Sequence, residues 1–103
     1  MMEKHTPHYR LGAIFDLVSD AESVPFTRSA IGGGLELGLD QYAMRAVILR
    51  LTRKCFYKSM TTYLNHRVWQ DVYLGATSDG IAVYIKVTGC LDGSPPVIQF
   101  KRK

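Results

Sequence analysis

The spacing of the apolar residues changes at Lys54, and this change limits the folds that the chain can adopt. Before Lys54 the apolar residues recur at intervals of three and four, as in amphipathic helices; after it they alternate with polar residues, as in strands. Helices followed by strands indicate an α+β fold, with helices packed on one face of a mainly antiparallel sheet. A second core would need more apolar residues than 103 residues supply. We therefore predict a single two-layer domain over residues 1–103.

Two helices with regular apolar stripes are predicted in the first half. Thr6-Pro7 is typical of a helix start, because a hydroxyl caps the helix and proline suits its first position. The stripe that follows is Leu11, Ile14, Phe15 and Val18. Asp40 should cap the other helix, whose stripe is Met44, Val47, Ile48 and Leu51.

Proline and glycine interrupt the segment between these helices. Val24-Pro25-Phe26 predicts only a short edge segment, because proline excludes a central strand. Thr27 is positioned to cap a weaker helix over residues 28–31. Gly32-Gly33-Gly34 opposes a helix there, since each glycine costs about 1 kcal/mol relative to alanine.

Four strands are predicted after Lys54: 56–62, 67–73, 81–88 and 97–101. Asp79-Gly80 and the turn-rich segment 92–96 are the turn signals before the last two. In the third strand the alternate residues from Ile81 to Val87 should face the helices. The opposite, open face would then present Tyr84, Lys86, Gln99 and Lys101. A basic, partly aromatic face suits RNA, and an ordinary solvated face is the alternative.

The net charge of +4 is distributed unevenly. Residues 1–52 carry 5 basic and 6 acidic residues, a balance of −1, whereas residues 53–103 carry 8 and 3, a balance of +5. A basic half favours a polyanionic partner such as nucleic acid. The chain has neither an apolar run of roughly 18 residues nor a secretory signal. We expect a cytoplasmic protein that does not contact membranes, in which Cys55 and Cys90 are reduced, buried and inert.

Several stretches resemble one family of bacterial toxins, the motility quorum-sensing regulator (MqsR) toxins. The resemblance extends from about Met2 to Lys103. Its main motifs are Tyr57-Lys58-Ser59-Met60-Thr61-Thr62-Tyr63, His66 and Trp69-Gln70-Asp71-Val72-Tyr73, with further similarity over Met2–Leu11, Thr27–Ala30, Glu36–Asp40 and Phe100-Lys101.

The resemblance implies a RelE-like ribonuclease fold, with helices packed on a twisted sheet. It implies an enzyme that cleaves mRNA without the ribosome, preferentially at GCU-type triplets, and so arrests growth. The implied partner is a cognate MqsA-like antitoxin with a zinc-binding N-terminal domain and a helix-turn-helix C-terminal domain; operator DNA would be bound only through it. Because that zinc belongs to the antitoxin, we expect no metal and no other cofactor here.

The resemblance also implies the site residues. The expected catalytic residues follow from the family motifs: Lys58 after the tyrosine of the first motif, Gln70 after the tryptophan of the second, Tyr84 in the Val-Tyr-hydrophobic-Lys strand, and Lys101 after the last phenylalanine. The expected RNA-binding residues are Lys86, Tyr57, Met60 and Arg102.

Three features depart from the family pattern. Gly32–Gly34 replaces a better helix-forming stretch, and residues 89–96 form a longer segment that is richer in turns; both concern the scaffold. Leu74 stands where a basic residue is expected, which bears on RNA affinity or sequence preference.

Metal-free RNA cleavage uses the ribose 2′-hydroxyl as a nucleophile on the adjacent phosphate. It needs a base for the hydroxyl proton, stabilisation of the phosphorane charge, and an acid for the 5′-oxygen. Lys58 and Lys101 would stabilise the phosphorane, and either would need a pKa lowered from about 10.4 to act as the base. Tyr84 would donate or relay a proton, or stack on a base. Gln70 would orient the phosphate or read a base edge.

Five other residues have competing interpretations. His66 is an alternative acid or base, since histidine titrates near physiological pH, but its place at a hairpin entry favours a capping or exposed role. His5 and His8 lack further ligands nearby, so a metal site is not expected there. Trp69 would lie in the core or against the antitoxin. Lys86 would belong to the site or contact a phosphate outside the chemistry.

Two functions compete with the enzyme. One is a non-catalytic nucleic-acid-binding module that uses the same basic face. The other is an interaction subunit that acts as a co-repressor with its antitoxin, a role that an enzyme could have in addition. The complete set of four expected catalytic residues favours the enzyme, because a pure binder has no reason to retain it.

Overall fold

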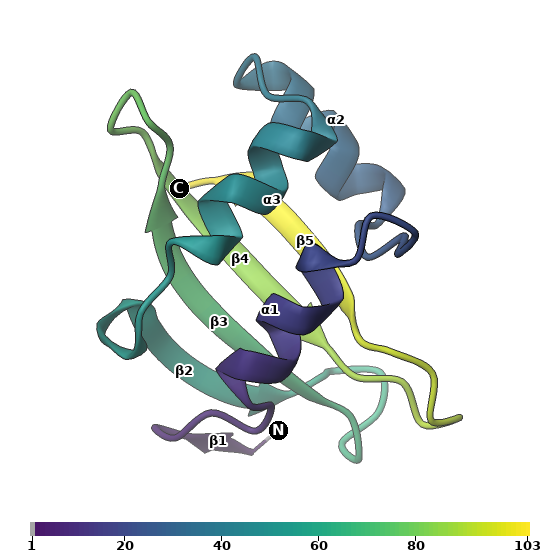
Figure 1. The fold of residues 1–103 in the computed structure, drawn as a ribbon. Helices are drawn as coiled ribbons and strands as arrows, with labels where there is room; N and C mark the ends of the chain where they lie inside the picture. Colours follow the sequence, from purple (N-terminus) through teal and green to yellow (C-terminus); the bar gives the residue numbers. More distant parts are fainter. Residues whose placement is uncertain (1) are drawn as a thin grey trace.

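The computed structural model describes residues 2–103 and contains three helices, a short 3-10 turn and a five-stranded sheet (Figure 1). The sheet is antiparallel throughout, in the order β1-β2-β3-β4-β5. This is the predicted α+β fold, consistent with a RelE-like toxin. The elements are β1 (Glu3–Lys4), α1 (Leu11–Ser19), α2 (Arg28–Glu36), α3 (Gln41–Leu49), η1 (Arg53–Cys55), β2 (Phe56–Thr61), β3 (Trp69–Ala76), β4 (Ala82–Thr88) and β5 (Val97–Arg102).

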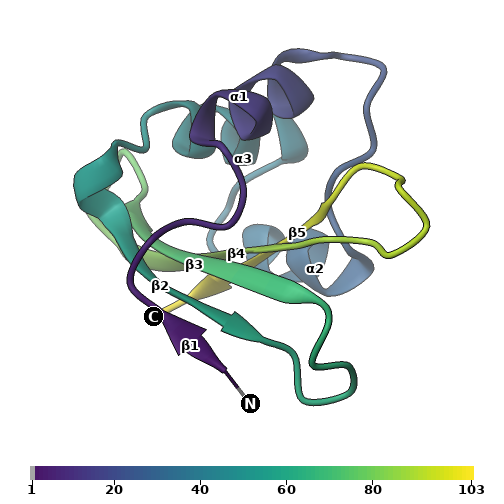
Figure 2. The same cartoon turned by 90° about the horizontal axis from the view of Figure 1, so that it is seen from below.

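The helices leave one face of the sheet uncovered. Helices α1 and α3 lie side by side across the other face, and α2 packs along β5 at the edge (Figure 2). The alternating residues of β4 that were predicted to face the helices are buried there, with Ile81 at the strand entrance only partly covered. Fully burying each such aliphatic side chain stabilises the fold by about 1.5–3 kcal/mol. The core thus fixes which residues of β4 and β5 face outward.

The first helix begins at Leu11, so the prediction of a start at Thr6-Pro7 is wrong. The backbone N–H groups of His8 and Tyr9 donate to the buried Asp71 carboxylate on β3, which holds this segment out of a helix. The same anchoring lets residues 3–4 pair with β2 as a strand that the sequence did not predict.

Helix α2 continues through the glycine triplet, contrary to expectation. A Cβ at Gly33 would collide with the carbonyl oxygen of Phe100, and one at Gly34 would collide with the Met44 side chain. Close contact with β5 and α3 therefore accounts for two of the three glycines. The predicted caps are confirmed. The Thr27 hydroxyl accepts from the Ala30 N–H at 3.1 Å, and the Asp40 carboxylate accepts from the Ala43 N–H of α3 at 2.8 Å.

The remaining segments have the predicted secondary structure, but some of their first and last residues differ from the prediction. Phe26 forms an isolated parallel bridge with Ile98, as expected of an edge segment. Strand β3 begins at Trp69 rather than at residue 67, because residues 62–68 form a turn closed by Thr62 and Asn65. None of the helices within residues 2–103 is both long and apolar enough to cross a bilayer.

Candidate active site

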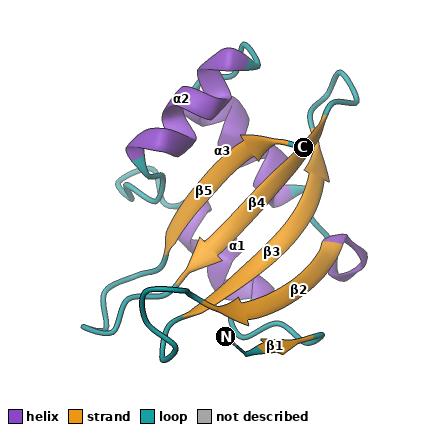
Figure 3. Ribbon diagram, turned by 180° about the vertical axis from the view of Figure 1, so that it is seen from behind, coloured by secondary structure: helices purple, strands orange, loops and turns teal. Residues whose placement is uncertain are grey.

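The open face of the sheet carries the side chains that the sequence assigned to it. Tyr84 lies opposite Lys101 in the β4–β5 register, and Lys86 lies opposite Gln99. Figure 3 shows this face toward the viewer, with the helices behind it. The predicted common face of β4 and β5 is confirmed.

A groove of about 500 Å³ lies across this face. It is lined from both halves of the sheet, by β2 and β3 on one side and by β4 and β5 on the other. Seven of the eight expected site residues line it, and Gln70 does not. The lining residues are Tyr57, Lys58, Met60, Val72, Tyr84, Lys86, Lys101, Arg102 and Lys103.

A β-bulge shapes the β2 side of the groove. Phe56 pairs with Tyr73 while Lys58 pairs with Val72, so Tyr57 is an extra residue on β2. Bulges bend a strand and redirect its side chains, and they are frequent beside active sites. Here the bulge leaves Tyr57 exposed next to Lys58, whose Nζ lies 5.3 Å from the centre of the Tyr57 ring.

Lys58 forms an ion pair with Glu3 of β1, with 3.0 Å between Nζ and Oε1. The hydrogen bond to Glu3 is the main reason that the pKa of Lys58 is raised; the negative charge of Glu3 adds to it, while desolvation opposes it. Lys58 therefore stays protonated at neutral pH. Of the two roles considered for it, this favours electrostatic stabilisation of a phosphorane over proton abstraction.

Gln70 lies on the open face beside the groove. It pairs with Met60 on β2 and Thr88 on β4. On β2, Met60 is the next residue after Lys58 on the same face of the sheet. Its Nε2 donates to the Thr88 hydroxyl at 2.8 Å, which fixes the direction of the amide. The Gln70 amide is thus held on the open face, beside the groove but not in its lining.

Leu74 shares the register row of Tyr84 and Lys101. It adds an apolar side chain where the resemblance led us to expect a basic one. The row therefore has one cation, contributed by Lys101.

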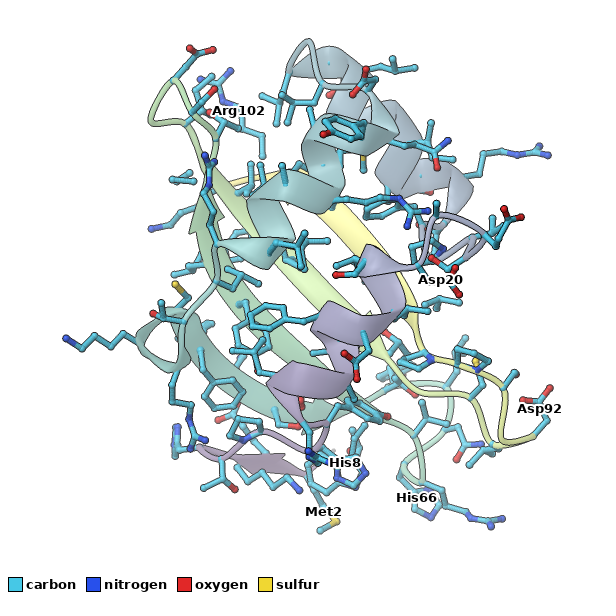
Figure 4. All side chains as sticks on the ribbon, viewed as in Figure 1. Met2, His8, Asp20, His66, Asp92 and Arg102 are labelled. Carbon is cyan, nitrogen blue, oxygen red and sulfur yellow. The ribbon has the colours of Figure 1, made fainter. Side chains whose placement is uncertain are left out.

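The histidines lie outside the groove. His66 is exposed in the β2–β3 turn, at the opposite end of the sheet from Arg102 (Figure 4). His8 stacks on Trp69 with 5.3 Å between ring centres, and desolvation followed by the nearby Lys4 charge lowers the pKa of His8. Trp69 itself faces away from the groove. Within residues 2–103 no three histidine, cysteine or acidic side chains are grouped as a metal site.

Both thiols are half-buried and unpaired with each other, rather than fully buried as expected. Cys55 ends η1 and packs against the edge of the core, whereas Cys90 lies in the β4–β5 loop. Neither lines the groove.

Sequence reasoning did not single out Glu3. A strand of two residues is too short to show a period, so its pairing with β2 had no signal in the sequence. Its contact with Lys58 follows from the anchoring of the N-terminal segment by Asp71.

The sequence is similar to that of known proteins. The family described as "Motility quorum-sensing regulator, toxin of MqsA" matches residues 6–102. The mRNA interferase toxin MqsR of Escherichia coli (strain K12) is 47% identical over 102 residues, which make up 99% of this chain and 100% of that protein. The chain therefore belongs to the motility quorum-sensing regulator (MqsR) toxin family.

Proposed function

We propose that the protein is a growth-arresting toxin that cleaves mRNA, independently of the ribosome and without a metal ion. The observation that carries this proposal is the groove, where Lys58, Tyr84 and Lys101 come together from three strands. Family membership and the mRNA interferase name of the Escherichia coli relative support the same activity. Preference for GCU-type triplets is part of the proposal and rests on the resemblance alone.

In this reaction the 2′-oxygen attacks the adjacent phosphorus and the 5′-oxygen leaves. Lys58 and Lys101 stabilise the extra negative charge of the phosphorane, and Tyr84 donates a proton to the leaving oxygen. Lys86 and Arg102 contact neighbouring phosphates. The products carry a 2′,3′-cyclic phosphate and a 5′-hydroxyl.

Two uncharged side chains of the groove, Tyr57 and Met60, can contact RNA bases. Tyr57 is exposed at the bulge and offers a ring on which a base can stack, and Met60 adds an apolar contact beside it. Gln70 contacts the phosphate or a base edge where the strand leaves the groove. These contacts would give the enzyme its sequence preference.

The antitoxin is the proposed protein partner. The family description, toxin of MqsA, supports a cognate MqsA-like antitoxin. We propose that this antitoxin carries the zinc-binding and helix-turn-helix domains, silences the toxin, and connects it to operator DNA for regulation of their operon.

The test is incubation of the purified protein with a defined mRNA, without ribosomes and with a chelator, followed by mapping of the new ends. We expect discrete cuts with 5′-hydroxyl ends that Lys58→Ala abolishes. Lys54→Ala is the matched control, because Lys54 is an exposed lysine of η1 outside the groove.

Two results would count against the proposal. Intact RNA that nevertheless binds a folded, monodisperse sample would favour a non-catalytic binding module. Equal cleavage by wild type and Lys58→Ala would indicate a contaminating nuclease or a different site.

A further inference from the structure

We propose that Glu3 is a further catalytic residue, which accepts the proton of the ribose 2′-hydroxyl. This inference rests on the proposed function, because it assigns a base to the same cleavage reaction.

The groove needs a proton acceptor that its lining does not readily supply. Among residues 2–103, the residues that line it include five with cationic side chains and none with an acidic one. Ammonium and guanidinium groups are hydrogen-bond donors without a free acceptor. In the free protein the contact with Glu3 holds Lys58 in this form. A phosphate that replaces the carboxylate is also an anion and holds Lys58 protonated in the same way, so Lys58 would not serve as the base. A carboxylate is an acceptor in its ordinary charged state.

Glu3 is the acid that the fold brings to the groove. It stands opposite Met60 in the β1–β2 register, whereas the next residue, Lys4, places its Nζ 4.2 Å from the Trp69 ring, away from the groove. This alternation directs Glu3 toward Lys58, and 3.0 Å separates the two charged groups. The Glu3 side chain is 49% exposed, so RNA can reach it.

Two features hold β1 in place. The backbone of Met2 forms hydrogen bonds of 2.8 Å with both the hydroxyl and the N–H of Thr61 on β2. Asp71 anchors the chain that leaves β1. The backbone is therefore fixed by hydrogen bonds both before and after Glu3, and these bonds position its carboxylate.

The proton balance closes with residues already in the site. When RNA binds, a phosphate oxygen takes the place of the carboxylate as the partner of Lys58. The 2′-hydroxyl of the same linkage then lies next to Glu3, which takes its proton as the O2′–P bond forms. The P–O5′ bond breaks, and the 5′-oxygen receives a proton from Tyr84. The single negative charge of Glu3 is outweighed by the five groove cations.

The alternative is that Glu3 only forms an ion pair with Lys58 in the free protein and takes no part in the reaction. The two roles predict opposite effects of Glu3→Gln on the cleavage rate. For a base, Glu3→Gln lowers kcat on the order of 100-fold, because acid–base groups contribute about that much or more. RNA binds the variant as tightly as wild type or more tightly, since a negative charge is removed. If Glu3 is only an ion-pair partner of Lys58, the variant binds RNA more tightly than wild type and cleaves it as fast or faster. Glu36→Gln, at the exposed end of α2, is the matched control for loss of a negative charge.

A modified substrate separates this role of Glu3 from a role at the leaving group. RNA with sulfur at the scissile 5′-bridging position, which leaves without protonation, should not rescue the variant.

Wild-type cleavage with Glu3→Gln at or above the wild-type rate would overturn the role of Glu3 alone. Absence of cleavage by wild type would instead overturn the proposed function. Rescue of Glu3→Gln by the sulfur substrate would assign Glu3 to the leaving group rather than to the nucleophile, which also contradicts the inference.

Discussion

Both carboxylate oxygens of Asp71 accept a hydrogen bond from the backbone N–H of His8, each at 3.0 Å. One of them also accepts from the N–H of Tyr9 at 2.9 Å, and the Tyr9 hydroxyl donates to the carbonyl oxygen of Trp69 at 2.8 Å. Asp71 is fully buried. These bonds fasten the link between β1 and α1 to β3, so they position the N-terminal strand relative to the groove.

Replacing Asp71 with Asn should destabilise the protein by about 1–3 kcal/mol, because an amide has only one acceptor oxygen and its NH₂ group would face a backbone donor. The free energy of unfolding in urea measures this loss. Asp16→Asn, on the exposed face of α1, should change it little. Equal unfolding midpoints for the two variants would show that the Asp71 contacts do not support the fold.

The neighbouring glycines of α2 should respond in opposite directions to alanine. Gly33→Ala should cost about 1–3 kcal/mol, since its Cβ meets the Phe100 carbonyl oxygen and α2 must move away from β5. Gly32→Ala should stabilise by about 0.5–1 kcal/mol, because its Cβ has open space and alanine favours helix. Urea unfolding of both variants tests this, and a gain in stability from Gly33→Ala would contradict the close packing.

Tyr73 should make stability depend on pH in the alkaline range. Its side chain is fully buried, and this burial, followed by the nearby Asp71 charge, raises the pKa of Tyr73 to about 12. In the unfolded chain this hydroxyl loses its proton near pH 10. The free energy of unfolding should therefore keep its full value below about pH 10 and fall by about 2 kcal/mol toward pH 12.

Tyr73→Phe isolates that effect. The Tyr73 hydroxyl has no hydrogen-bond partner within residues 2–103, so the variant should be as stable as wild type or about 1 kcal/mol more stable at pH 8. Other groups titrate equally in both proteins. The difference in unfolding free energy between them should therefore grow from pH 10 to pH 11.5, and a constant difference would rule out the titration.

The sequence predicted the elements that have a clear apolar period. The stripes of α1 and α3, the alternation in β4 and the turn at Gly80, which has a φ of +81°, all depend on contacts between near neighbours in the chain. The start of α1 was predicted wrongly because the competing partner, Asp71, lies more than 60 residues away. The continuation of α2 depends in the same way on packing against β5.

The site was predicted as a face rather than as a groove. Alternation placed Tyr84 and Lys101 together, and motif resemblance added Lys58 and Gln70. The bulge at Tyr57 and the contact of Glu3 with Lys58 need a strand register, which a single sequence does not supply.

Tyr84→Phe should distinguish a proton donor from a stacking platform, because it removes the hydroxyl and keeps the ring. As a donor, Tyr84 predicts a fall in kcat on the order of 100-fold with RNA affinity unchanged. The sulfur-leaving substrate should restore the rate of this variant, in contrast to Glu3→Gln. Unchanged cleavage of ordinary RNA by Tyr84→Phe would leave Tyr84 a stacking role only.

Leu74→Arg should strengthen RNA binding, because it adds a second cation to the register row of Tyr84 and Lys101. For a single-stranded RNA, one additional phosphate contact should make the slope of log affinity against log salt steeper by about 0.7. Binding titrations at several salt concentrations give that slope. Leu91→Arg is the matched control, since Leu91 is exposed in the β4–β5 loop away from the groove lining. If both variants gain affinity equally, the effect is one of net charge, and Leu74 has no special place in the RNA path.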